Sequence, residues 1–130
     1  MSTDNGLPRI LVAESNKGWQ KIFEEQLKDN AELVFAETPD QTIQLFQSEY
    51  DFNAITVSTS LAALDDGVEV VKFARKSGFK KPVIATGSKT ASNQLLLDAG
   101  ASDATDKLYF VKYIKTLVEA MKPRAMGLII

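Results

Sequence analysis

Short apolar segments alternate with longer segments of helical spacing along this chain, and this alternation limits the possible folds more than any other feature. The apolar segments are residues 10–13, 33–36, 54–57 and 82–85, with a weaker one at 101–104. Their lengths are typical of buried strands. Strands that alternate with helices pair in parallel through right-handed crossovers, which place helices on both faces of the sheet. The sequence therefore predicts an α/β fold with one doubly wound, five-stranded parallel sheet.

The expected helix boundaries agree with this alternation. Thr38, Pro39 and Gln41 have the residue types of an N-cap, a first helical residue and a capping-box partner. Gly78 and Gly100 are suited to ending helices, because glycine adopts the left-handed conformation that follows many helix ends. Helices are predicted over about residues 17–29, 39–48, 67–77, 91–99 and 111–121.

The composition excludes several kinds of chemistry. The 130 residues contain no cysteine and no histidine, so disulfides, Cys/His zinc sites and catalysis by a thiol or an imidazole are not expected. The 15 basic and 17 acidic residues are spread along the chain without a basic run, which argues against nucleic-acid binding. No segment has the pattern of a signal peptide or of a membrane span, and a cytoplasmic location without membrane contact is therefore expected.

One domain is expected over residues 9–122, with an N-terminal tail at 1–8 and a C-terminal tail at 123–130. The C-terminal tail contains "RAMGLII", which is unusually apolar for a free end. We expect this tail either to dock on the domain or on a partner, or to begin a linker.

Ligands and chemistry gather beyond the carboxyl ends of the central strands in sheets of this kind. Around these ends the sequence reads "RILVAESN", "YDFNAITV", "DDGVEVVKFAR", "PVIATG" and "DAGASDATDK". With these stretches, the chain from about Pro8 to Met121 resembles a response-regulator receiver domain, the flavodoxin-like phospho-acceptor module of two-component signalling. The resemblance implies the (βα)5 receiver fold and a role in a bacterial phosphorelay.

In receiver domains a carboxylate at the end of the third strand accepts a phosphoryl group, and acids after the first strand hold Mg²⁺. The acceptor position matches Thr56, whose hydroxyl cannot form an acyl phosphate. The two acidic positions match Glu14 and Ser15, so only one carboxylate is left. The resemblance therefore implies a degenerate pocket with weak or no Mg²⁺ binding, no other cofactor and no catalytic residue.

Two other receiver positions keep suitable side chains. Thr86 matches the hydroxyl that binds the phosphoryl group, although Ser88 is an alternative, and Lys107 matches the lysine that pairs with the phosphoryl oxygens. Without a phosphoryl group, Lys107 can pair with Glu14 instead. The aromatic switch position of the family matches Ala104, which has no ring to move.

The loop over residues 58–66 is longer than the usual receiver loop at this position. It either fills the pocket with small and apolar groups or brings Asp65 or Asp66 into the pocket as a replacement acid. Tyr109 and Tyr113 are four residues apart in the last helical segment, which makes them a candidate partner surface.

Three functions are compatible with these observations. The favoured hypothesis is a pseudo-receiver, which is not an enzyme and acts as a phosphorylation-independent interaction or regulatory module, with a signalling kinase or an effector domain of the same chain as its partner. The second is an atypical receiver that is phosphorylated on Asp65 or Asp66. The third is a flavodoxin-like binder of a small anionic ligand at "TGSKT", where the amides of a helix start favour anions. Thr56, Ser15 and Ala104 favour the first, because all three depart from the receiver pattern.

Overall fold

The computed structural model describes residues 6–87 and 89–122 of the chain. The strands are β1 (Arg9–Ala13), β2 (Glu32–Ala36), β3 (Ala54–Val57), β4 (Val83–Ala85) and β5 (Asp103–Ala104). The helices are α1 (Lys17–Leu27), α2 (Pro39–Phe46), α3 (Gly67–Lys76), α4 (Thr90–Ala99) and α5 (Phe110–Met121), and the 3-10 helix η1 (Lys107–Tyr109) precedes α5. The apolar tail at 123–130 lies outside the described residues.

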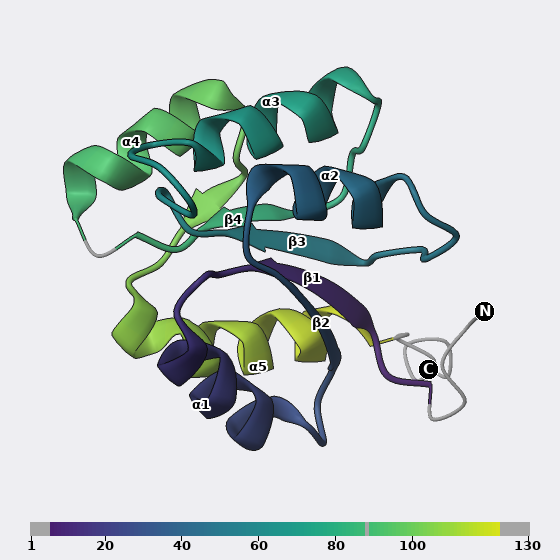
Figure 1. Ribbon diagram of the computed structural model, residues 1–130. Helices are drawn as coiled ribbons and strands as arrows, with labels where there is room; N and C mark the ends of the chain where they lie inside the picture. The colour runs from purple at the N-terminus through teal and green to yellow at the C-terminus, as the bar shows by residue number, and fades with distance from the viewer. Residues whose placement is uncertain (1–5, 88, 123–130) are drawn as a thin grey trace.

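The five strands form one parallel sheet with the order β2-β1-β3-β4-β5. Figure 1 shows α2, α3 and α4 on one face of this sheet and α1 with α5 on the other. The predicted doubly wound α/β architecture is therefore confirmed. In the described part of the chain, no helix is both long enough and apolar enough to cross a bilayer.

Alternating side chains of the strands produce two separate cores. In β3, Ile55 and Val57 pack toward α2, α3 and α4, whereas Ala54 packs toward α1 and α5. The second core includes Phe23 of α1 and Phe110 of α5, whose ring centroids are 4.0 Å apart. Both sheet faces are covered, and β1, β3 and β4 accordingly consist mainly of apolar residues.

The helix-boundary predictions hold with one variation. The Thr38 hydroxyl accepts the Gln41 N–H, as an N-cap does, but the Gln41 side chain accepts the N–H of Glu37 rather than that of Thr38. Gly78 and Gly100 have φ values of 90° and 124°, which glycine adopts without strain.

The last strand is shorter than predicted. The sequence indicated a strand over residues 101–104, but β5 contains only Asp103 and Ala104. Ala101 still belongs to the turn that ends α4, because its N–H donates to the Leu96 carbonyl.

Candidate functional site

The carboxyl ends of β1, β3 and β4 meet at one edge of the sheet. These strands are in register up to their last residues, Ala13, Val57 and Ala85. The ladder then continues by one residue, because the Ser58 N–H donates to the Ala13 carbonyl and the Thr86 N–H donates to the Val57 carbonyl. Glu14, Ser58 and Thr86 are therefore neighbours across three strands.

Glu14 and Lys107 form a buried ion pair at this edge. Lys107 Nζ lies 2.7 Å from Glu14 Oε1, and the exposed fractions of the two side chains are 17% and 3%. Glu14 Oε2 accepts the Asn16 N–H. Glu14 Oε1 has no hydrogen bond of suitable geometry, and the positive charge of Lys107 balances its negative charge. The pairing that the sequence suggested is present, and Ser15, beside Glu14, is partly buried.

Thr56 does not lie at the end of β3. It is in register with Val12 of β1 and Ile84 of β4, two residues before the level of Glu14. The Thr56 side chain is buried inside the sheet, and its hydroxyl has no hydrogen-bond partner. The hydroxyl that is level with Glu14 belongs to Ser58, a residue that sequence counting did not select.

The start of β3 explains this difference. The Asn53 N–H donates to the Arg9 carbonyl, and the Arg9 N–H donates to Asn53 Oδ1, so pairing with β1 begins at Asn53. Counting along the chain from Tyr50 cannot detect this register, because it depends on contacts between strands that are far apart in sequence.

A second acid near this edge, Glu37, is also engaged by neighbours. Lys17 forms an ion pair with the Glu37 carboxylate, and Gln20 Nε2 donates to it at 3.0 Å. The hydrogen bond from Lys17, followed by that from Gln20, lowers the pKa of the Glu37 carboxyl. Gln20 also donates to the Glu14 carbonyl at 2.6 Å, which links the start of α1 to the end of β1.

The β3–α3 loop is organised by the Asp66 carboxylate. Asp66 accepts three backbone N–H groups, those of Leu61, Ala62 and Ala63, at 2.6, 2.9 and 2.8 Å. A carboxylate that accepts several N–H groups is held in one orientation by charge-assisted hydrogen bonds. Asp66 therefore holds the loop in shape. It stands at the N-cap position of α3, but its side chain makes no capping hydrogen bond to that helix.

We expect Asp66→Asn to lower the free energy of unfolding by about 2 kcal/mol, because an amide oxygen is a weaker acceptor and the amide NH₂ faces other donors. Hydrogen exchange should accelerate at the amides of Leu61, Ala62 and Ala63. Asp65→Asn is the matched control and should change stability by less than about 0.5 kcal/mol, as is usual for loop surfaces. Equal effects of the two variants would contradict the role of Asp66.

Asp65 lies at the tip of the same loop. Its φ is 58°, in the left-handed region, and its N–H donates to the Ser60 hydroxyl. The preceding Leu64 side chain is 84% exposed. The loop therefore exposes the apolar side chain of Leu64 to solvent. Its two acids differ in function: Asp66 stabilises the loop through hydrogen bonds, whereas Asp65 forms part of the exposed tip.

The β4–α4 loop is held by Asn93, a residue that the sequence analysis did not select. Asn93 Oδ1 accepts the Gly87 N–H at 2.7 Å, and Asn93 Nδ2 donates to the Gly87 carbonyl at 3.2 Å. A Cβ on Gly87 would lie 2.7 Å from the Thr59 hydroxyl, so the two loops are in tight contact. Thr86 is buried beside them, and its alternative, Ser88, lies outside the described residues.

The two candidate partner tyrosines do not form one patch. Tyr109 is 64% exposed and lies in η1, next to Leu108, which is 77% exposed. Tyr113 packs instead against the core between α1 and α5, and its hydroxyl donates to Asp103 Oδ2 at 2.7 Å. The two tyrosines are not one turn apart on the same helix, because α5 begins at Phe110 and Tyr109 precedes it.

Ala104, at the position of the aromatic switch, pairs with Ala85 at the end of β5.

Tyr113 provides a pH-dependent contribution to stability. Burial, followed by the hydrogen bond to Asp103, raises the pKa of the Tyr113 phenol above its ordinary value of about 10. The contribution of the neutral phenol is complete below about pH 10 and is lost as the pH rises toward the folded-state pKa. We expect Tyr113→Phe to lose about 1 kcal/mol at pH 7 in urea denaturation, and its deficit to shrink above about pH 10. Parallel stability curves for both proteins would contradict this.

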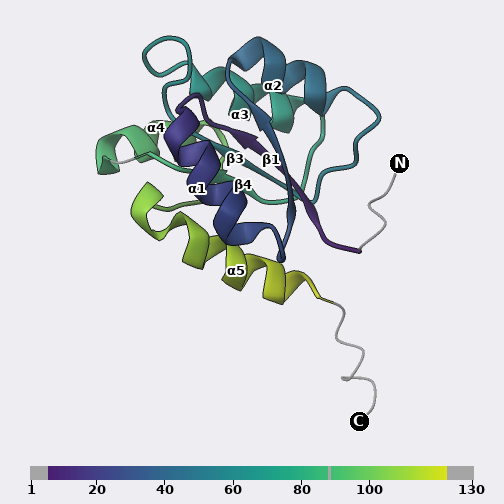
Figure 2. The ribbon, with the colours of Figure 1, turned by 60° about the horizontal axis from the view of Figure 1, so that its bottom comes forward.

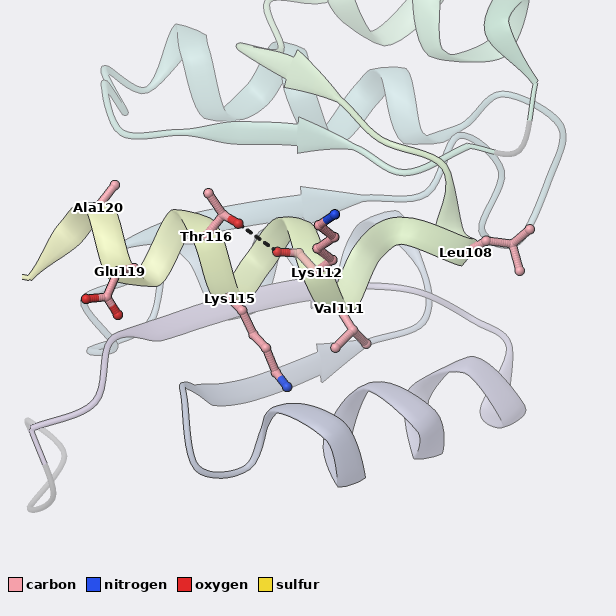
Figure 3. Close-up of a pocket in the computed structure, with 7 residues that line it drawn as sticks. All are labelled: Leu108, Val111, Lys112, Lys115, Thr116, Glu119 and Ala120. Atoms are coloured by element: carbon pink, nitrogen blue, oxygen red, sulfur yellow. Dashed lines mark hydrogen bonds between the residues drawn. The ribbon is translucent and has the colours of Figure 1, made fainter.

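The outward face of α5 carries a shallow groove with two lysines. Figure 3 shows the Lys112 and Lys115 side chains extending in different directions from the helix. The Thr116 hydroxyl donates to the Lys112 carbonyl at 3.1 Å. The residues that line the groove are Leu108, Val111, Lys112, Lys115, Thr116, Glu119 and Ala120. With the exposed Leu108 at one end, this face combines apolar and basic groups.

No protein-family model matches the sequence, and no curated protein matches it. Solved structures of receiver domains are similar to the chain. The Francisella response regulator 1452 receiver domain has a TM-score of 0.73 at 20% identity, over 88% of this chain and 99% of that one. A CheY-like receiver domain protein from Methanospirillum hungatei has a TM-score of 0.73 at 19% identity, over 88% of this chain and 96% of that one. A response regulator receiver protein from Pseudoalteromonas atlantica has a TM-score of 0.75 at 17% identity, over 88% of this chain and 100% of that one. The chain therefore has the receiver fold.

Proposed function

We propose that this chain is a receiver-like signalling module that works without phosphoryl transfer and acts through protein contacts. The observation that carries the proposal is the Glu14–Lys107 ion pair beside Ser58 at the carboxyl edge. The position on β3 that is level with Glu14 holds a hydroxyl, and the lysine that would face a phosphoryl group is already paired.

The chemistry of these groups supports the proposal. We infer that Ser58, rather than Thr56, occupies the place of the phospho-acceptor carboxylate, because Ser58 is level with Glu14 in the ladder. A serine hydroxyl cannot form the labile acyl phosphate on which receiver chemistry depends. Both Ser58 and Thr56 are hydroxyl residues, so either position would lack the acceptor.

The residues at this edge do not fit a magnesium site. Mg²⁺ is held by carboxylate and other oxygen ligands in octahedral geometry. Glu14 is the single acid among Glu14, Ser15 and Ser58, and its two oxygens face Lys107 and the Asn16 N–H. Over residues 6–87 and 89–122, no group of three or more acidic side chains could hold a metal ion. We therefore propose that the module functions without Mg²⁺.

The loop acids do not favour phosphorylation at another position. Asp66 would have to release three backbone N–H groups before its carboxylate could react. Asp65 is fixed at the loop tip by its own backbone conformation and by Ser60. No feature of the described residues favours a small-anion binder over the interaction module.

The proposed partner is a protein, either a signalling kinase or an effector domain of the same chain. Leu108 and Tyr109 directly follow Lys107 in η1 and are exposed, and Leu108 also lines the groove on α5. Large exposed apolar groups beside lysines suit a protein partner with apolar and acidic side chains.

The first experiment is an amide NMR titration with Mg²⁺ and then beryllofluoride, a mimic of the phosphoryl group. We expect no saturable shifts, and no acyl phosphate after incubation with acetyl phosphate. Saturable shifts at Glu14, Ser58, Thr86 and Lys107 would contradict the proposal.

A variant that restores the acids gives the positive control. Ser15→Asp combined with Ser58→Asp should bind Mg²⁺ measurably, because three carboxylates would then meet at one edge. Ser15→Asp combined with Thr56→Asp is the matched control. We expect it to destabilise the domain without creating the site, since Thr56 is buried within β3 and lies two residues before the level of Glu14. If only the variant with Thr56→Asp bound Mg²⁺, Thr56 rather than Ser58 would be the residue that corresponds to the phospho-acceptor.

A further inference from the structure

A second pocket lies at the opposite edge of the sheet, away from the site described above. Its volume is about 450 Å³, within the range of about 300–1,000 Å³ that is usual for binding pockets. It lies between the segment before β1, the α1–β2 turn and the end of α5. The residues that line it are Gly6, Leu7, Pro8, Asp29, Asn30, Asn53, Val118, Glu119, Met121 and Lys122.

The walls of this pocket combine apolar and polar groups. Val118 and Met121 belong to or pack on the core between α1 and α5, and Pro8 adds a third apolar group. Asp29 and Lys122 are exposed at the rim and carry opposite charges. Apolar side chains combined with a few polar groups are typical of binding pockets, and here the apolar groups can receive aliphatic side chains.

The end of α5 lies at this pocket. Figures 1 and 2 both place the start of β1 and the end of α5 at the same end of the domain. α5 ends at Met121, and both Met121 and Lys122 line the pocket. Pro123 follows, and proline cannot continue the hydrogen-bonding pattern of a helix. Lys122, the last described residue, therefore lies at the pocket.

We propose that the pocket is the docking site of the chain's own C-terminal segment, residues 126–130, which reads "MGLII". Four of these five residues are aliphatic or methionine, and they match the apolar walls. At about 3.3 Å per extended residue, the eight residues after Lys122 can span up to about 26 Å, which leaves ample length to turn back.

The tether favours this segment over a second copy or another protein. A segment joined to Lys122 by a short linker has an effective concentration in the millimolar range at the pocket. It also avoids most of the loss of translational and rotational entropy that a separate molecule undergoes on binding. The inference does not depend on the proposed function, because the pocket shares no residue with the carboxyl-edge site.

The experiment is a paramagnetic relaxation measurement on the full 130-residue chain. Because the chain contains no cysteine, Asp29→Cys gives a single site for a nitroxide label at the rim of the pocket. Methyl signals of Leu128, Ile129 and Ile130 should lose most of their intensity relative to the reduced label. The matched control is Leu64→Cys, which places the label on the exposed tip of the β3–α3 loop and should leave these signals unchanged.

Dilution and a tail variant complete the test. The broadening should be the same at tenfold lower protein concentration, since docking is within one chain. Leu128→Asp combined with Ile129→Asp should remove the broadening of Ile130, with little change in the unfolding of the domain. Absence of broadening from the rim label would overturn the proposal, and broadening that disappears on dilution would assign the pocket to a second copy and overturn it equally.

Discussion

Lys107→Met should lower the free energy of unfolding by about 3 kcal/mol. The substitution leaves the Glu14 carboxylate buried, with its side chain 3% exposed, and without the charge that compensates Oε1. Breaking a buried ion pair on one side costs about 3–5 kcal/mol. We take the lower end, because the Lys107 side chain is 17% exposed and water can approach after its removal. Urea denaturation at pH 7 measures the change.

A double-mutant cycle measures the interaction energy between Glu14 and Lys107 separately from the contacts that each side chain makes with other residues. Glu14→Gln with Lys107→Met removes both charges and should recover most of the lost stability, because no isolated charge is then buried. A loss below about 1 kcal/mol in Lys107→Met, the size found for exposed pairs, would mean that solvent already screens the site. The proposal that the module works without phosphoryl transfer would then lose its main support.

Gly67→Ala should also destabilise the domain by about 3 kcal/mol, for a steric reason. A Cβ on Gly67 would lie 2.2 Å from the Ser58 carbonyl oxygen and 2.9 Å from that of Thr59. Both atoms belong to the backbone and cannot rotate away as a side chain can. The Gly67 N–H also donates to the Thr59 carbonyl, so relief of the clash would break that hydrogen bond. Overpacking of this kind costs about 1–3 kcal/mol or more.

Gly78→Ala is the control for this prediction. Gly78 has open space around it but a φ of 90°, so alanine there should cost only about 1–2 kcal/mol of backbone strain. The two variants, compared by urea denaturation, distinguish a clash from a conformational preference. If Gly67→Ala were no more destabilising than Gly78→Ala, the β3–α3 loop would have room that the structure does not show.

The Gly67 contact also connects the fold to the site. Ser58 ends the ladder at Glu14, and its carbonyl lies against Gly67 at the start of α3. Asp66 holds the turn between them through three N–H groups. A side chain on Gly67 should therefore displace Ser58, and NMR shifts in Gly67→Ala should extend to Glu14.

Much of the fold could be predicted because its signals are local. Short apolar segments between helical patterns indicated β1 to β4 and a parallel sheet, and Thr38, Gly78 and Gly100 indicated helix ends. β5 was the least accurate prediction, since a strand of two residues has no pattern of its own.

The site was predictable in part. Glu14 and Lys107 could be paired from sequence, because the resemblance to receiver domains places both residues in the pocket at the carboxyl edge. Ser58, Asn93 and the roles of Asp66 could not be found in this way. Their partners, Ala13, Gly87 and the amides of the loop, are chosen by the packing of the chain rather than by spacing in the sequence.

Residue types and their periodicity were sufficient for the order of strands and helices and for the burial of β3, and the composition shows the lack of cysteine and histidine. These properties depend on neighbours within about one helical turn or on composition. Tertiary contacts were required to show that Ser58 is level with Glu14, that the Tyr113 hydroxyl donates to Asp103, and that the Asp66 carboxylate accepts backbone N–H groups of the loop. The reason is that a parallel ladder sets its register between distant segments, and moving that register by one residue exchanges the faces of every side chain in the strand.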